Sequence, residues 1–159
     1  MQAENHPTYE DKRGSFTPLP LSEKWNQVNV SVNTRKFTFR GMHYQEQMPQ
    51  TKYIKVVQGS IIDFIYDLNK DELTTVKLNN QQSVLVPKDK AHGFLTLEDN
   101  TIVTYLTDAA YLPQYEKSIP WHKIRPLSKE ILSVGEKMYG SVENGLRELI
   151  LSDKDKIGK

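Results

Sequence analysis

Phe39-Arg40-Gly41-Met42-His43-Tyr44-Gln45 is the stretch of sequence that decides the fold, and it carries a high density of chemical groups. It places a guanidinium, an imidazole, a phenol and an amide around one glycine, between segments whose patterns predict strands. In a regular strand successive side chains point to opposite faces, so Arg40 and His43 would lie on opposite faces. A bulge at Gly41 would bring both side chains to one face.

The composition limits the class of protein. The 159 residues are enough for a packed core, and we expect a single domain over residues 1–159. Cysteine is absent, which excludes disulfides and thiolate metal sites. The net charge of +1 produces no field that would select nucleic acid or an anionic membrane. The first residues do not resemble a secretory signal and no apolar run reaches membrane length, so we expect a cytoplasmic protein.

Short segments rich in β-branched residues recur along the chain and indicate strands. Gln58-Gly59 separates two such runs and predicts a hairpin between them. Strands at this short spacing, with turn residues between them, favour an antiparallel sandwich or barrel. The expected strands include residues 28–32, 39–45, 52–57, 61–67, 74–78, 83–86, 92–97 and 101–107.

The apolar period changes from Leu127 onward. Apolar residues from Leu127 to Met138 fit a short amphipathic helix that starts near Ser128 and ends at Gly140. The segment 146–151 fits either a strand or a helix. The tail 152–159 is charged, and its composition alone indicates a frayed end without function.

The chain also carries a series of short motifs in order, namely Asp11-x-Arg13-Gly14-x-Phe16, Gln27-x-Asn29-x-Ser31, Arg40-Gly41-Met42-His43-Tyr44-Gln45, Lys52 before Gly59, Val86-Pro87, Ala91-His92-Gly93-Phe94, Tyr105 before Pro113, and Ser152-x-Lys154-Asp155. Together they resemble the dTDP-4-dehydrorhamnose 3,5-epimerase family, a group of nucleotide-sugar epimerases. The resemblance implies an all-β fold, the metal-free cupin double-stranded β-helix (jelly roll), with short C-terminal helical elements in a partly helical extension over residues 122–159. It also implies that the protein needs no cofactor.

By this resemblance His43 is the general base and Asp155 is its carboxylate partner, which would orient the imidazole and stabilise its protonated form. Lys52 resembles the family's cation near the C4 oxygen, where it would favour the enolate formed when a neighbouring proton leaves. Tyr105 resembles the acid on the opposite face of the sugar ring. Epimerisation needs such a second group, because returning the proton to the same face regenerates the starting configuration.

The resemblance also implies a substrate site for a nucleotide-diphosphate sugar. Arg13 and Arg40 resemble the cations that hold the diphosphate, since a guanidinium offers a planar fork of donors. Gln27 and Asn29 resemble residues that contact the base or ribose. His92 resembles a residue that contacts the sugar or a phosphate.

In this family a neighbouring subunit completes each site, so the resemblance implies a homodimer in which Arg13 and Phe16 serve the partner's pocket. Two positions depart from the family pattern. Pro18 stands where an acidic residue is usual, and Ala110-Tyr111 replaces a pair of tyrosines. Tyr111 is therefore the candidate for stacking on the nucleobase, or the base is not thymine.

Two functions from different classes remain open on the sequence. The first is an epimerase that inverts C3, C5 or both in a nucleotide-linked 4-keto-6-deoxy sugar. The second is a cupin that binds a nucleotide sugar without turning it over. A metal-dependent cupin is disfavoured, because no His-x-His occurs among the four histidines. An isomerase that shifts the keto group is a nearer alternative, but the central motif and Tyr105 favour the epimerase.

Overall fold

The computed structural model describes residues 2–7, 9–12, 14–16 and 23–158. Most of the described residues that form regular structure lie in strands, and the helices follow them in the chain. The elements are β1 (Tyr9–Asp11), β2 (Gly14–Phe16), β3 (Gln27–Asn33), β4 (Phe39–Gln45), β5 (Lys52–Gln58), β6 (Ile61–Asp67), β7 (Glu72–Leu78), β8 (Ser83–Val86), β9 (Lys90–Thr96), β10 (Thr101–Thr107), β11 (Glu116–Ser118), α1 (Arg125–Tyr139), α2 (Val142–Glu148) and α3 (Asp153–Ile157), with 3-10 turns at Pro113–Tyr115 and Trp121–Lys123.

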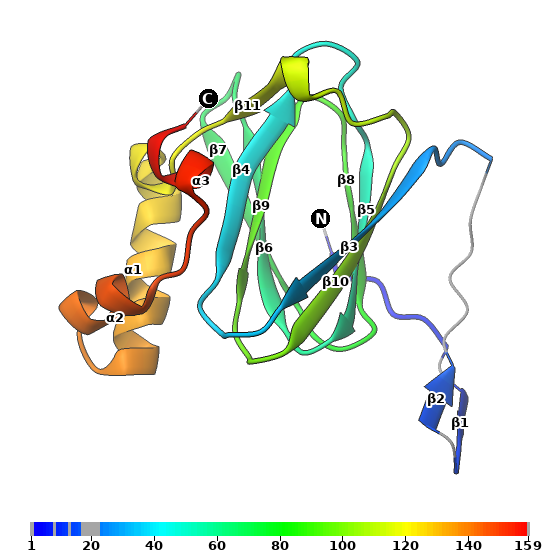
Figure 1. Cartoon of the computed structure of the whole chain (residues 1–159), viewed down its shortest axis with the longest axis horizontal. Helices are drawn as coiled ribbons and strands as arrows, with labels where there is room; N and C mark the ends of the chain where they lie inside the picture. The colour runs from blue at the N-terminus through cyan, green and yellow to red at the C-terminus, as the bar shows by residue number, and fades with distance from the viewer. Residues whose placement is uncertain (1, 8, 13, 17–22, 159) are drawn as a thin grey trace.

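Two antiparallel sheets face each other, in the orders β3-β10-β5-β8 and β11-β4-β9-β6-β7. Figure 1 shows them enclosing a barrel-like interior, with the small β1–β2 hairpin set apart from it. Apolar residues from both sheets, including Ile54, Ile65 and Val103, form one core. The all-β jelly-roll prediction is therefore confirmed for the described part of the chain.

A second core lies on the outer side of the five-stranded sheet, where α1 packs (Figure 1). Phe39 and Leu95 from the sheet contact Leu127 and Ile131 from the helix, and all four side chains are buried. Because this sheet is covered on both faces, β9 is buried along almost its whole length rather than at alternate positions. The C-terminal helices thus form a third layer on the sheet that holds β4.

The hairpin predicted at Gln58-Gly59 is wrong. β5 pairs with β10 and β8, whereas β6 pairs with β7 and β9, so the turn carries the chain from one sheet to the other. Gly59 has φ +87°, and a Cβ there would lie 2.4 Å from the Thr101 hydroxyl oxygen. A local turn signal cannot distinguish the two connections, because the strand that follows is chosen by long-range packing.

The helix predicted near Ser128 is confirmed as α1, which spans Arg125–Tyr139 and is capped by Gly140 in the left-handed region with φ +86°. Both interpretations of segment 146–151 prove partly right. Helix α2 ends at Glu148, and Ile150 then forms a parallel bridge to Thr38 beside β4. Among the described residues, no helix is both long and apolar enough to span a membrane.

Candidate active site

The bulge predicted at Gly41 is confirmed. In the pairing of β4 with β9, Arg40 lies opposite Phe94 and His43 opposite His92, and the register shifts between these two pairs. Gly41 has φ +139°, and a Cβ there would lie 2.6 Å from the Cα of Gly93 on β9. The close approach of the two glycines therefore allows the irregularity that brings Arg40 and His43 to the same cavity.

This cavity, which we call the His43 cavity, has a volume of about 510 Å³. Its walls come from both sheets, from the loop that follows β10 and from the C-terminal tail. It is large enough for a ligand of drug size, and its lining is rich in charged and amide groups. The lining residues are Gln27, Asn29, Thr38, Phe39, Arg40, His43, Gln50, Lys52, Tyr105, Thr107, Tyr111, Glu116, Ile150, Leu151, Ser152, Lys154 and Asp155.

His43 and Asp155 form a hydrogen-bonded pair at the cavity wall, with His43 Nε2 2.5 Å from Asp155 Oδ1. The His43 side chain is 24% exposed and that of Asp155 is 3% exposed. Ser118 Oγ donates to the same carboxylate at 3.3 Å, and the Gly41 N–H approaches its other oxygen at 3.4 Å. The carboxylate is thus held on several sides while the imidazole remains accessible from the cavity.

Burial alone would raise the pKa of the Asp155 carboxyl, but the hydrogen bond and charge of His43 outweigh it, and the pKa is lowered. The carboxylate therefore stays ionised at neutral pH and accepts the N–H of His43 Nε2. Within the described residues, the structure gives no protein partner for the other ring nitrogen. This arrangement leaves one imidazole nitrogen available to take a proton.

Lys52 and Tyr105 enter the same cavity from the opposite sheet, on the neighbouring strands β5 and β10. Burial lowers the pKa of the Lys52 ammonium to about 8, although the charges of Asp63 and Glu116 oppose this. Burial likewise raises the pKa of the Tyr105 phenol. At neutral pH the cavity therefore contains a mostly protonated ammonium and a protonated phenol, facing an imidazole on the other sheet.

Arg40, Gln27, Asn29 and Tyr111, to which the family resemblance assigns substrate contacts, all line the cavity. Arg40 Nε donates to Asn33 Oδ1 at 2.8 Å, which fixes the guanidinium. Gln27 Nε2 donates to Asn29 Oδ1 at 2.8 Å, and the Tyr111 N–H donates to Gln27 Oε1 at 3.2 Å. The Tyr111 ring is 44% exposed and is available for stacking.

His92 is not among the residues that line the His43 cavity. Its side chain is 8% exposed, and Nε2 lies 2.7 Å from Oδ1 of Asp63, which is fully buried on β6. Burial raises the pKa of the Asp63 carboxyl in spite of the opposing charges of His92 and Lys52. A direct contact between His92 and substrate remains a prediction. Arg13 lies outside the described residues, and of Phe16 the structure describes the backbone in β2 but not the side chain.

The contacts of Glu116 and Lys154 in the cavity were not predicted from the sequence. Lys154 Nζ donates to both Glu116 carboxylate oxygens at 2.9 Å, and the Tyr111 hydroxyl donates to Oε2 at 2.9 Å. Burial would raise the Glu116 pKa, but these bonds outweigh it and the pKa is lowered. Lys154 belongs to the tail motif quoted above, so the motif itself was the available signal. Glu116 begins the short strand β11, and nothing in the sequence around it distinguished it from a solvated glutamate.

No group of three or more histidine and carboxylate side chains within the described residues is arranged to hold a metal ion. The titratable groups instead form pairs, namely His43 with Asp155, His92 with Asp63 and Lys154 with Glu116. Such pairs suit proton transfer and the binding of a charged organic substrate.

Comparisons with known proteins agree with this geometry. The family model described as dTDP-4-dehydrorhamnose 3,5-epimerase matches residues 6–159. An epimerase of that name from Methanothermobacter thermautotrophicus is 36% identical over 129 residues, covering 71% of this chain and 69% of the relative. Another from Mycobacterium tuberculosis is 39% identical over 101 residues, covering 58% of this chain and 50% of the relative. The alignments thus span about half to two thirds of the length of these curated relatives.

A solved structure extends the likeness to almost the whole chain. The epimerase of that name from Bacillus anthracis, determined with TDP and PPi bound, is 31% identical and superposes with a TM-score of 0.75. The superposition covers 98% of this chain and 90% of that one.

Proposed function

The chain belongs to the dTDP-4-dehydrorhamnose 3,5-epimerase family, and from this membership and the geometry of the His43 cavity we propose that it epimerises a nucleotide-linked 4-keto-6-deoxy sugar. The reaction removes a proton from a carbon next to the C4 ketone and returns a proton to the opposite face of the same carbon. The positions inverted are C3, C5 or both.

One observation carries the proposal, namely that an imidazole and a phenol enter one cavity from opposing sheets. His43 lies on β4 in the five-stranded sheet and Tyr105 on β10 in the four-stranded sheet. A sugar ring between them would present one face to each group, which is the arrangement that inversion requires. A protein that merely bound the sugar would not need an acid and a base on opposite sides.

In the proposed reaction His43 takes the proton, and the electron pair of the C–H bond moves toward the C4 oxygen. The Lys52 ammonium stabilises the negative charge that develops there. Tyr105 then donates its phenolic proton to the other face of the carbon. Its raised pKa keeps it protonated until this step, and Asp155 stabilises the imidazolium that forms on His43.

We propose a thymidine diphosphate as the nucleotide, with Arg40 near the diphosphate and with Gln27, Asn29 and Tyr111 near the nucleoside. All four residues line the His43 cavity. The Bacillus anthracis relative, whose structure holds TDP and PPi, supports this choice. Glu116 accepts hydrogen bonds from Lys154 and from the Tyr111 hydroxyl, and these bonds would hold the tyrosine ring in place.

We further propose a homodimer. Val28, Val30 and Val32 of the edge strand β3 are each about 60% exposed, and they form an apolar stripe along that strand. The β1–β2 hairpin lies apart from the barrel in Figure 1, as expected of a segment that contacts a second copy. The same hairpin carries Phe16.

Hydrogen exchange in D₂O, followed by NMR, tests the proposed activity. The protein is incubated with dTDP-4-keto-6-deoxyglucose and, separately, with a GDP-linked 4-keto sugar. We expect deuterium at C3 and C5 of the thymidine-linked sugar. Entry at C3 alone would identify a single-site epimerase, and no entry into any 4-keto sugar would favour the non-catalytic binding protein.

Tyr105→Phe tests the assignment of the acid in the same assay. Without the phenolic proton we expect at least one inversion to be blocked, while exchange initiated by His43 remains measurable. The reduction in product should be about 10²-fold, which is typical for removal of a general acid. Full epimerase activity in this variant would show that another group supplies the proton.

A further inference from the structure

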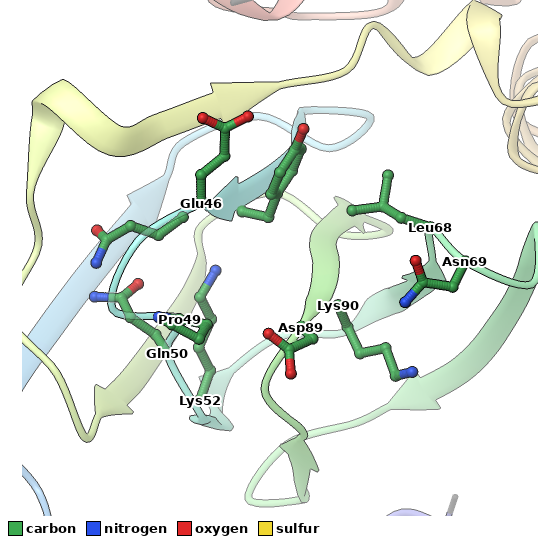
Figure 2. A pocket seen from close by; sticks show the side chains of 10 residues that line it. Glu46, Pro49, Gln50, Lys52, Leu68, Asn69, Asp89 and Lys90 are labelled. Carbon is green, nitrogen blue, oxygen red and sulfur yellow. The ribbon is translucent and has the colours of Figure 1, made fainter.

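A second cavity, which we call the loop cavity, opens between the loops at one end of the barrel. Its volume is about 470 Å³, close to that of the His43 cavity. It is lined by Tyr44, Gln45, Glu46, Pro49, Gln50, Lys52, Leu68, Asn69, Asp89 and Lys90. Figure 2 shows these side chains converging from the loops after β4 and β6 and from the turn before β9.

Lys52 and Gln50 line both cavities, so they separate the two spaces. In Figure 2 the Lys52 side chain lies at the edge of the loop cavity, with Leu68 and Asn69 on the opposite side. The Lys52 ammonium, which we propose stabilises the enolate, therefore borders both cavities. A nucleotide sugar in the His43 cavity would cover one of these approaches.

The Lys52 ammonium makes no hydrogen bond or close ion pair within the part of the chain that the structure describes. Asp63 and Glu116 act on it through charge at longer range. A half-buried ammonium has three donors to satisfy, and water is the partner that remains for those not directed at substrate. Such water must reach Lys52 by a path that substrate leaves open.

The charges around the loop cavity indicate which molecules it admits. Glu46 and Asp89 are exposed, and Lys90 is neutralised by an ion pair with Asp67 at 2.5 Å. Glu46 approaches Lys117 Nζ at 3.8 Å, and Lys52 adds a second ammonium to the lining. The two carboxylates and two ammonium groups balance, so the lining does not select an anion such as a phosphate, and water and small uncharged molecules can enter.

We propose that the loop cavity is a second opening to Lys52, which admits water and small uncharged molecules while a nucleotide sugar fills the His43 cavity. The inference rests on the proposed function for the identity of that sugar. The opening keeps the ammonium hydrated and in proton exchange with bulk solvent during turnover, and water can leave through it when substrate enters.

Carbamoylation of Lys52 by cyanate tests this opening, because the reactive species is the small, uncharged isocyanic acid. The free amine attacks the isocyanate carbon, a C–N bond forms, the C=N π bond opens, and the amine proton passes to the isocyanate nitrogen. With a pKa of about 8, Lys52 supplies free amine at pH 8. Peptide mass spectrometry measures the labelling rate at Lys52, with exposed Lys77 as the internal standard.

The rate is compared without ligand and with saturating dTDP-glucose, which lacks the 4-keto group and is not turned over. We expect Lys52 in the complex to react within about threefold of its rate in the free protein. Complete protection by dTDP-glucose would overturn the proposal. Calorimetry establishes separately whether dTDP-glucose binds, so a wrong nucleotide is recognised as a failure of the proposed function.

Leu68→Trp is the variant that narrows the loop cavity, and Leu85→Trp is its matched control. Both leucines are 39% exposed, but Leu85 lies on β8 and lines neither cavity. In the complex we expect Leu68→Trp to slow labelling of Lys52 about tenfold and Leu85→Trp to leave it unchanged.

In the ligand-free protein Leu68→Trp should slow labelling partially, because the His43 cavity is then open as well. Comparing Leu68→Trp with Leu85→Trp in the ligand-free protein therefore tests whether the loop cavity leads to Lys52, even if dTDP-glucose does not bind. Equal labelling of Lys52 in the two variants, with and without ligand, would show that the loop cavity does not lead to it.

Discussion

The two histidine–aspartate pairs of this protein lie side by side, yet their environments differ. His43 on β4 and His92 on β9 face each other across the strand pairing, and each Nε2 contacts an aspartate oxygen. The His43 side chain is 24% exposed at the cavity, whereas that of His92 is 8% exposed. The pKa of Asp155 is lowered, and burial raises that of Asp63. The same pair of residue types is thus open to the cavity at one position and enclosed at the other.

The two pairs differ in exposure because their aspartates lie on different kinds of element. Asp63 lies within β6, surrounded by strands on both sides, and one of its oxygens has no hydrogen-bond partner among the described residues. Asp155 lies on the short helix α3, which reaches His43 from outside the sheet. It is held by Ser118 and by the cap of Ser152 while His43 stays open to the cavity. His43 is therefore the candidate base, because its imidazole is accessible from the cavity whereas that of His92 is buried.

The largest expected effect comes from His43→Ala compared with His92→Ala. Loss of the general base should lower kcat by about 10³-fold or more, with the protein still folded. His92→Ala leaves the buried Asp63 carboxylate without its partner, so it should cost about 3 kcal/mol of unfolding free energy. Activity is measured by product formation and stability by urea titration. A stable but inactive His92→Ala protein would show that His92 takes part in the reaction.

A smaller loss of activity is expected for Asp155→Asn. An amide cannot stabilise the imidazolium and also offers a donor to the ring, so kcat should fall about 10²-fold while KM changes little. Asp153→Asn is the matched control, because Asp153 lies on the same helix but is exposed. Unchanged kcat in Asp155→Asn would remove the carboxylate from the proposed mechanism. The pH dependence of kcat should also change in Asp155→Asn and not in Asp153→Asn.

The smallest expected effect is on stability against pH. Asp155 has a lowered folded pKa, so its ionised form adds stability that is present above about pH 4 and is lost as pH falls through the folded pKa. Asp63 has a raised folded pKa, so its ionised form costs stability at neutral pH and this cost disappears as pH falls through the folded pKa.

Denaturant titrations of the wild type, Asp63→Asn and Asp155→Asn at several pH values test this contrast. As pH falls from neutrality, the wild type should gain unfolding free energy relative to Asp63→Asn. The difference between the wild type and Asp155→Asn should change mainly below about pH 4. If the unfolding free energies of the two variants changed with pH in the same way, the two carboxyls would not differ in the direction of their pKa shifts, and the contrast would be wrong.

Local patterns predicted much of the framework. The Gly41 bulge, most strands and helix α1 with its glycine end were predictable, because each depends on residues close together in the chain. The turn at Gly59 was predictable as a turn but not as a crossing between sheets. The frayed end suggested by the tail's composition is wrong, because α3 forms and the Asp155 side chain is buried.

The sequence by itself determined which chemical groups are available, and the tertiary structure decided which of them meet. An imidazole, an ammonium and a phenol in marked positions were visible in the sequence, as was the resemblance of their spacing to a family. The contact of Glu116 with Lys154 and the burial of His92 against Asp63 required the folded chain. Strand and turn preferences act over a few residues, whereas contacts between distant residues depend on how whole sheets and helices pack.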